Sequence, residues 1–91
     1  MSNLEEGLMY FTDGNLDKAE SCFTQAINEN RQNAEAFYNR GKVNRSKGDF
    51  TAAINDFRQV LEINPNYTEA SVAIEMMKNI LAFRDPNLLN P

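Results

Sequence analysis

The sequence predicts an all-α fold built from repeated pairs of antiparallel helices, and three observations support this prediction. Displacing the 91-residue chain by 34 positions superimposes residues of the same kind. Within each copy, apolar residues recur at spacings of three and four, which is the period of an amphipathic helix. Glycine, asparagine and proline interrupt this pattern at regular intervals. We therefore expect two helix pairs, at about residues 2–33 and 34–67, followed by a single helix at about 67–83.

The internal repeat is carried by residue types that rarely match by accident. Identical residues at the 34-residue offset are Gly7 and Gly41, Gly14 and Gly48, Ala19 and Ala53, Phe23 and Phe57, Gln25 and Gln59, Asn30 and Asn64, Glu35 and Glu69, and Ala36 and Ala70. Between these identities, small residues align with small ones and bulky apolar residues with bulky apolar ones. A repeated packing unit requires such a correspondence.

The first helix pair begins with a capping signal. Ser2 stands three residues before Glu5, as in a capping box, so a helix is expected to start there. Asp13-Gly14-Asn15 separates this helix from a second amphipathic one. The apolar positions of that second helix are Leu16, Ala19, Phe23, Ala26 and Ile27. No proline ends it, so the break between residues 28 and 33 depends on asparagines.

The second helix pair has stronger boundaries. Its first helix is expected at about 35–46 and its second at about 50–63. Gly48 permits a positive φ between them, and Asp49 can cap the helix that follows. Pro65 ends the second helix because proline lacks an N–H group and restricts the residue before it. Gly41 lies inside the first helix at a cost of about 1 kcal/mol relative to alanine, so we expect a neighbouring helix to approach closely there.

The pattern of the last amphipathic segment, at about 67–83, predicts a capping helix. Its apolar side is formed by Ala70, Ile74, Met77 and Leu81, which would cover the end of the second pair. Its other side carries Ser71, Glu75 and Lys78 at the positions of Phe37, Gly41 and Asn44, so no further helix is expected to pack there. Repeat arrays need such polar terminal units. We therefore expect a complete module of about two and a half repeats, with residues 84–91 as a C-terminal tail.

These features give the chain a clear resemblance to tetratricopeptide repeat proteins. The residues that carry it are Phe37, Gly41, Gly48, Asp49, Phe50, Ala53, Phe57, Val60 and Pro65, matched in the first copy by Gly7, Tyr10, Gly14, Leu16, Ala19, Phe23 and Ala26. The resemblance covers residues 2 to about 83 and implies a right-handed superhelix of helix pairs. Glu6 and Arg40 replace the usual leucine, and Asn44 replaces a common aromatic residue. We therefore expect looser packing within the pairs than in a typical repeat.

Composition excludes most catalytic and metal-binding functions. The chain has no histidine and one cysteine, which removes the usual general base, Cys/His zinc sites and disulfides. No loop has the carboxylate spacing of a calcium site. We expect no enzymatic activity, no cofactor and no metal, and we interpret Cys22 as a small packing residue.

Charge and hydropathy limit the partners and the location. The net charge of −4 disfavours nucleic acid, since binding to it depends on clustered basic residues. No apolar run approaches the roughly 18 residues of a membrane span, and the first residues do not resemble a signal peptide. We expect a soluble, cytoplasmic protein that does not bind membranes.

The resemblance implies that the first helix of each pair lines a concave groove that binds a peptide or helix of another protein. Carried over position by position, the groove residues are Leu4, Leu8, Phe11, Tyr38, Asn39, Lys42, Arg45, Val72, Met76 and Ile80. Only Asn39 matches the basic clamp with which some family members hold a C-terminal carboxylate, so that mode is disfavoured. An apolar groove with Lys42 and Arg45 at its centre suits an amphipathic partner with an acidic residue.

Other interpretations of the same residues stay open. An apolar stripe on a repeat helix is equally well explained by internal packing. A second copy of the chain could cover it, which would make the groove a homodimer interface. Leu88 and Leu89 of the tail could also fold back onto it. Lys42 and Arg45 are also typical of a solvated helix face balanced by Glu35. The sequence therefore predicts an interaction adaptor, or alternatively a self-associating module without a peptide ligand.

Overall fold

A computed structural model describes residues 1–84, and over this range the chain consists of α-helices without any strand. The helices are α1 (Asn3–Thr12), α2 (Leu16–Glu29), α3 (Ala34–Ser46), α4 (Phe50–Ile63) and α5 (Thr68–Arg84). The predicted all-α fold with two helix pairs and a further C-terminal helix is confirmed. The alternative in which Leu88 and Leu89 fold back onto the last helix lies outside the described residues.

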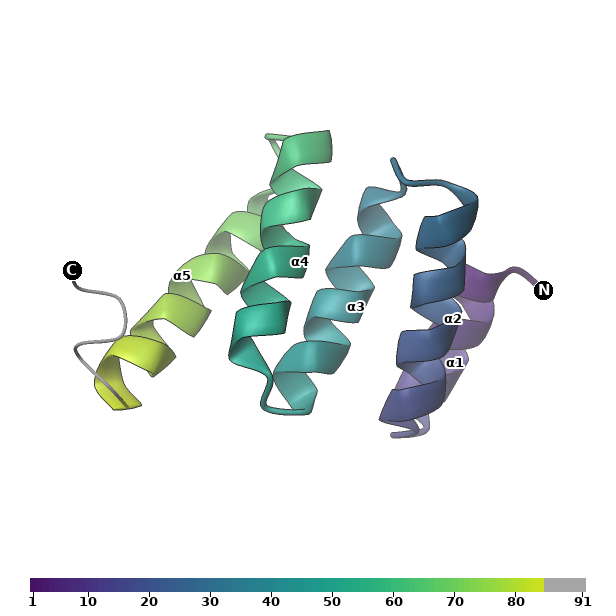
Figure 1. The fold of residues 1–91 in the computed structure, drawn as a ribbon, viewed down its shortest axis with the longest axis horizontal. Helices are drawn as coiled ribbons and strands as arrows, with labels where there is room; N and C mark the ends of the chain where they lie inside the picture. Colours follow the sequence, from purple (N-terminus) through teal and green to yellow (C-terminus); the bar gives the residue numbers. More distant parts are fainter. Residues whose placement is uncertain (85–91) are drawn as a thin grey trace.

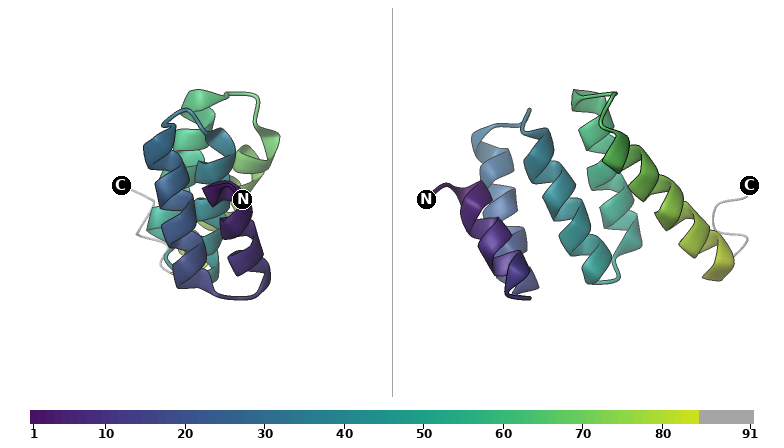
Figure 2. Two further views of the ribbon diagram at one scale, coloured as in Figure 1. Left: turned by 90° about the vertical axis from the view of Figure 1, so that its right-hand side faces the viewer. Right: turned by 180° about the vertical axis from the view of Figure 1, so that it is seen from behind.

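The helices form an elongated array with extents of 44 × 27 × 18 Å. Successive helices run in alternating directions (Figure 1). Helices α2 and α4 lie on one side of the array, and α1, α3 and α5 lie on the other, which faces the viewer in the right-hand panel of Figure 2. Contacts join mainly helices that are neighbours in the sequence, with a smaller contact between α1 and α3. This arrangement is that of a short helical repeat array.

Side-chain caps fix where the first four helices begin. The Ser2 hydroxyl accepts from the Glu5 N–H, and the Ser2 N–H donates to the Glu5 carboxylate, so the predicted capping box is present. The side chains of Asn15, Asn33 and Asp49 accept from backbone N–H groups at the starts of α2, α3 and α4. Such caps each stabilise a helix by about 1 kcal/mol. Asparagine thus sets the boundary between the two pairs, where proline is missing.

Two glycines turn the chain and two allow helices to approach. Gly14 and Gly48 have φ values of 80° and 84° in the tight turns within each pair. A Cβ atom on Gly41 would lie 2.6 Å from the Phe57 ring, and one on Gly7 would lie 2.5 Å from the Phe23 ring. The close approach expected at Gly41 is therefore confirmed, and the first pair repeats it.

The core runs through the whole array. Phe23, Phe57, Val43, Val60 and Met77 have the largest fully buried side chains. The apolar side of α5 behaves as predicted: Ala70, Ile74 and Met77 are buried, and Leu81 packs against them. Its polar side faces solvent, since Ser71 and Glu75 are exposed. Helix α5 thus closes the array with an apolar inner side and a polar outer side.

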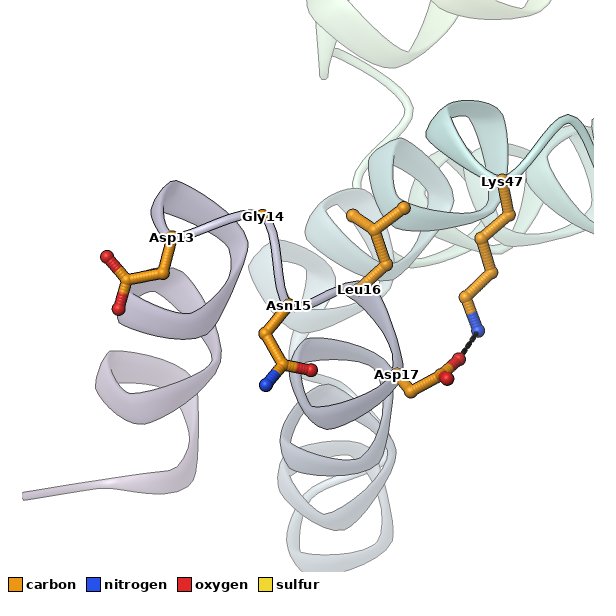
Figure 3. A pocket seen from close by; sticks show the side chains of 6 residues that line it. All are labelled: Asp13, Gly14, Asn15, Leu16, Asp17 and Lys47. Atoms are coloured by element: carbon orange, nitrogen blue, oxygen red, sulfur yellow. Dashed lines mark hydrogen bonds and ion pairs between the residues drawn. The ribbon is translucent and has the colours of Figure 1, made fainter.

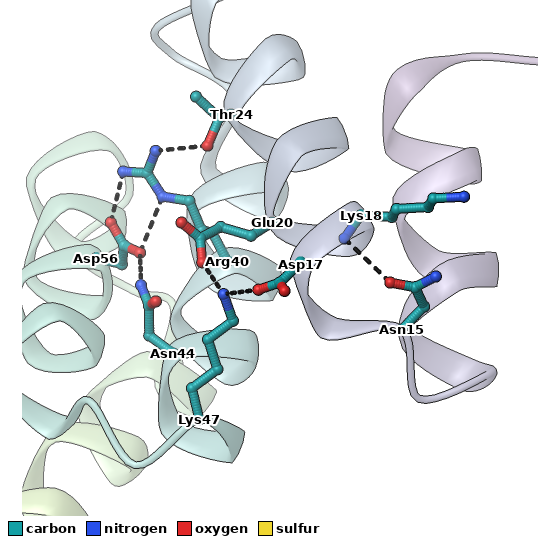
Figure 4. A network of polar contacts seen from close by, with 9 residues as sticks. All are labelled: Asn15, Asp17, Lys18, Glu20, Thr24, Arg40, Asn44, Lys47 and Asp56. Carbon is teal, nitrogen blue, oxygen red and sulfur yellow. Dashed lines mark hydrogen bonds and ion pairs between the residues drawn. The ribbon is translucent and has the colours of Figure 1, made fainter.

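Asp56 is the buried acceptor of a polar network that joins α4 to α3 and, through Arg40, reaches α2 (Figure 4). Only 6% of its surface is exposed. It accepts from Nε and Nη2 of Arg40, at 3.0 and 2.8 Å, and from Nδ2 of Asn44 at 2.9 Å. Arg40 also donates to the hydroxyl of Thr24 in α2, at 3.2 Å. Arg40 and Asn44, where looser packing was expected, are therefore both hydrogen-bonded to Asp56 inside the interface.

Candidate functional site

Helices α1, α3 and α5 share one side of the array, and we call it the α1–α3–α5 face (Figure 2). Large apolar side chains remain exposed on it. They are Leu8 (36% exposed), Val72 (52%), Met76 (50%) and Ile80 (36%). These side chains come from the first and last helices, whereas α3 contributes aromatic and basic groups between them. A folded chain that leaves such residues uncovered offers a surface for association.

A cleft of about 260 Å³ lies between α3 and α5 on this face. Its lining residues are Tyr38, Arg45, Thr68, Glu69, Val72, Ala73 and Met76. The Tyr38 ring is held in place, because it packs against Phe57 with ring centroids 5.6 Å apart and against Tyr67 at 5.2 Å. The cleft therefore has a rigid aromatic wall and a rim of exposed aliphatic side chains.

Lys42 and Arg45 place positive charge beside this cleft. The Nζ atom of Lys42 lies 5.6 Å from the centroid of the Phe11 ring and 5.4 Å from that of Tyr38. Such cation–π contacts contribute about 0.5–1 kcal/mol at exposed sites. Within residues 1–84, neither Lys42 nor Arg45 forms an ion pair with Glu35 or another acid. Both cations are therefore available to an acidic group of a ligand.

The opposite end of the cleft is acidic. Burial raises the pKa of the Tyr67 hydroxyl, and the nearby carboxylates of Glu35 and Glu69 raise it further. The hydroxyl therefore stays protonated at neutral pH, and two negative charges lie at the end of the face where α3 and α5 begin. The face thus has a direction, from acidic at the start of these helices to basic about two turns later.

The family follows from comparison of the whole chain with family models. A model described as tetratricopeptide repeat matches residues 34–67, and a second model of the same description matches residues 2–33. The chain belongs to the tetratricopeptide repeat family. The comparison with curated proteins gave no match. Tetratricopeptide repeats generally mediate protein–protein interaction, and they are typically non-enzymatic modules.

The structure separates the predicted groove residues of this tetratricopeptide repeat protein into two groups. Tyr38, Arg45, Val72 and Met76 line one cleft. Leu4, Phe11 and Leu8 form the other group, which packs on the core or lies outside that cleft. Leu4 packs against both core clusters, Phe11 packs against the smaller one, and Leu8 lines a separate depression on α1.

Asn39 differs most from what its predicted role requires. It is only 4% exposed, and its Nδ2 atom donates to the backbone oxygen of Glu35 in the same helix, at 2.9 Å. Thr68, by contrast, lines the cleft but was not predicted. The 34-residue offset gives no signal for it, because it aligns Thr68 with Ala34, which is not a predicted groove residue.

A larger depression of about 630 Å³ lies at the α1–α2 turn but is an open polar surface (Figure 3). Lys47 reaches across it to Asp17, with Nζ 2.6 Å from Oδ1. Figure 3 shows the Asp13 carboxylate and the Asn15 amide pointing away from Lys47. Because its polar groups do not converge, this depression is a weaker candidate site than the cleft between α3 and α5.

The single cysteine of this repeat protein has the surroundings of a packing residue. Cys22 is buried, and burial together with the charge of Glu6 raises the pKa of its thiol. Its thiolate is therefore scarce at neutral pH, which agrees with a packing role. Within residues 1–84, no three metal-ligating side chains of the His, Cys, Asp and Glu types lie together. None of the helices in this range is long and apolar enough to cross a membrane.

Proposed function

We propose that this protein is an interaction adaptor whose α1–α3–α5 face binds an amphipathic peptide or helix of a partner. An apolar side chain of the partner enters the cleft between α3 and α5, and an acidic side chain pairs with Arg45 or Lys42. The observation that carries the proposal is the cleft itself, in which half-exposed Val72 and Met76 adjoin a cation without an ion-pair partner in the described chain.

The physical basis is the combination of apolar burial and one directional charge. Covering Val72 and Met76 removes apolar surface from water, which favours association. Tyr38 is held by two other rings, so little side-chain entropy is lost when a ligand packs on it. Glu69 at the acidic end disfavours a second carboxylate there and so selects one orientation of the ligand.

A double variant that changes one residue of α3 and one of α5 tests this proposal. We expect the double variant Arg45→Glu, Met76→Glu to lose the proteins that the unaltered chain captures from its native cell, as identified by mass spectrometry. Glu75→Arg is the matched control, because Glu75 lies on the polar side of the same helix and is exposed. Circular dichroism would establish that both variants fold. An unchanged set of captured proteins in the double variant would contradict the proposal.

Self-association through the same face is the second candidate function. The observation that favours it is the number of exposed apolar side chains there, which are Leu8, Val72, Met76 and Ile80. Light scattering over a range of concentrations separates the two candidates. A dimer that Met76→Glu dissociates would support self-association, whereas a concentration-independent monomer would exclude it.

A further inference from the structure

In each of α1, α3 and α5, three positions related by the 34-residue offset lie on the N-terminal side of the array. In α3 and α5 this side faces the helix before, α2 or α4. We call these three positions the leading edge of each helix. They hold Glu6, Met9 and the C-cap residue Asp13 for α1, Arg40, Val43 and the C-cap residue Lys47 for α3, and Ile74, Met77 and Leu81 for α5. The central residue is covered where a preceding helix exists, since Val43 is 0% exposed and Met77 is 1% exposed. Met9 is 54% exposed. Among residues 1–84, no helix therefore covers the leading edge of α1 as α2 covers that of α3 and α4 covers that of α5.

The charges on this edge are reversed between the two repeats. In α3 the edge is basic: Lys47 pairs with Asp17 and Glu20 of α2, each at 2.6 Å (Figure 4). In α1 the matching positions are the acids Glu6 and Asp13. Within residues 1–84, neither of these carboxylates has an ion-pair partner. A helix that docks on α1 as α2 docks on α3 must therefore carry basic residues where α2 carries acidic ones.

A depression beside Met9 offers room for an apolar side chain of such a helix. It has a volume of about 270 Å³ and is lined by Leu8, Met9, Thr12 and Asp13. In the second repeat, Val43 belongs to a cluster with Ala19 and Phe23 of α2, and Leu16 packs against that cluster. The α1 edge thus combines an apolar centre, an adjoining hollow and negative charge on both sides.

We infer that the leading edge of α1 binds a basic amphipathic helix from another protein. Its apolar stripe covers Met9, and its basic residues occupy the positions that Asp17, Glu20 and Thr24 hold in α2. The partner's first two basic residues pair with Asp13, as Asp17 and Glu20 pair with Lys47. The third meets Glu6, as Thr24 meets Arg40. The required pattern is a basic residue at positions i, i+3 and i+7 of one helix face.

A second copy of this chain does not supply that pattern. A two-fold contact between α1 edges would place Glu6 and Asp13 of one copy against the same acids of the other. The sides of α2 and α4 that bind a leading edge are already covered by α3 and α5. The α1 edge also differs from the cleft between α3 and α5, so this inference stands independently of the proposed function.

Titration with designed helices tests the inference. The probe is a stapled peptide with the sequence of residues 15–29, serine in place of Cys22, and the substitutions Asp17→Lys, Glu20→Lys and Thr24→Lys. The control peptide keeps Asp17, Glu20 and Thr24. Amide chemical shifts of the isotope-labelled 91-residue chain report where each peptide binds. We expect the basic peptide to shift residues 6–13 and to bind at least about tenfold more tightly than the control.

Charge reversal on the protein gives the second arm of the test. Glu6→Lys and Asp13→Lys together should reverse the preference between the two peptides, whereas Glu75→Lys on the polar side of α5 should leave it unchanged. Equal affinity for both peptides would overturn the inference. Shifts confined to residues 72–80, or no shift at a peptide concentration of about 1 mM, which corresponds to a binding free energy weaker than about −4 kcal/mol, would also overturn it.

Discussion

Replacing Asp56 by alanine is expected to lower the free energy of unfolding by about 3 kcal/mol. The residue is 6% exposed, and its carboxylate accepts three hydrogen bonds, two from Arg40 and one from Asn44. Its removal leaves the Asn44 amide without an acceptor at a site where only 8% of that residue is exposed. It also leaves the guanidinium of Arg40 unpaired inside the interface.

The magnitude follows from how much solvent reaches the groups that are left. Removing one partner of a fully buried ion pair costs about 3–5 kcal/mol. The side chain of Arg40 keeps 24% of its surface exposed and also keeps its bond to Thr24, which places the loss near the lower end of that range. In a domain of this size each kcal/mol lost lowers the melting temperature by about 4–8 °C, so a loss of about 3 kcal/mol should lower it by about 12–24 °C.

Urea unfolding followed by circular dichroism measures this loss. The matched control is Glu75→Ala, which removes an exposed ion pair with Lys78 whose charged atoms are 3.7 Å apart. Such a pair contributes about 0–1 kcal/mol. Asp56→Asn should fall between the two variants, because it keeps one acceptor oxygen and loses the charge. If Asp56→Ala destabilises the chain no more than Glu75→Ala does, the reasoning about the buried network is wrong.

Three further perturbations follow from the structure. Gly41→Ala should lower the free energy of unfolding by about 1–3 kcal/mol, because the new Cβ would lie 2.6 Å from the buried Phe57 ring. This loss outweighs the better helix propensity of alanine. Urea unfolding of Gly41→Ala with and without Phe57→Leu measures how much of the loss a smaller side chain at position 57 restores. The Lys47 ammonium holds the pKa of Asp17 below its ordinary value of 3.8, so this pairing stabilises the fold above about pH 4 and is lost as the pH falls through the lowered pKa. Lys47→Met should therefore weaken the acid dependence of stability, which acid unfolding curves would show. The Cys22 thiol, with its raised pKa, should react with a disulfide reagent at pH 8 only after denaturation, and rapid labelling of the native chain would contradict its burial.

Most of the fold could be predicted because packing determines it. The 34-residue offset identified the helix pairs, since every repeat must bury the same positions against its neighbours. The position of Gly41 inside a helix predicted a close approach, and the Phe57 ring fills that space. The boundaries of α4 at Phe50 and Ile63 agree with the predicted ones, because a capping aspartate and a proline mark its ends.

The buried network could not be predicted with the same reasoning. Asp56 is an acid, and acids on amphipathic helices are usually solvated. A signal was nevertheless present: Asp56 lies three residues after Ala53 and four before Val60, on the apolar side of α4, and the offset aligns it with Cys22. The cleft is a similar case. Its wall depends on the tilted packing of Tyr38 against Tyr67, and a pattern of spacings does not specify how two rings meet.

The order in which the helices hold one another has a consequence for how a ligand would change the dynamics of the chain. Helix α5 contacts the rest of the chain mainly through α4. A fluctuation that detaches α5 therefore exposes Ile74 and Met77, while the first three helices stay packed together. A ligand seated between Tyr38 and Met76 would bridge α3 and α5 directly. Binding would then slow amide hydrogen exchange along α5 more than along α1, and the affinity would include the work of holding a terminal helix closed.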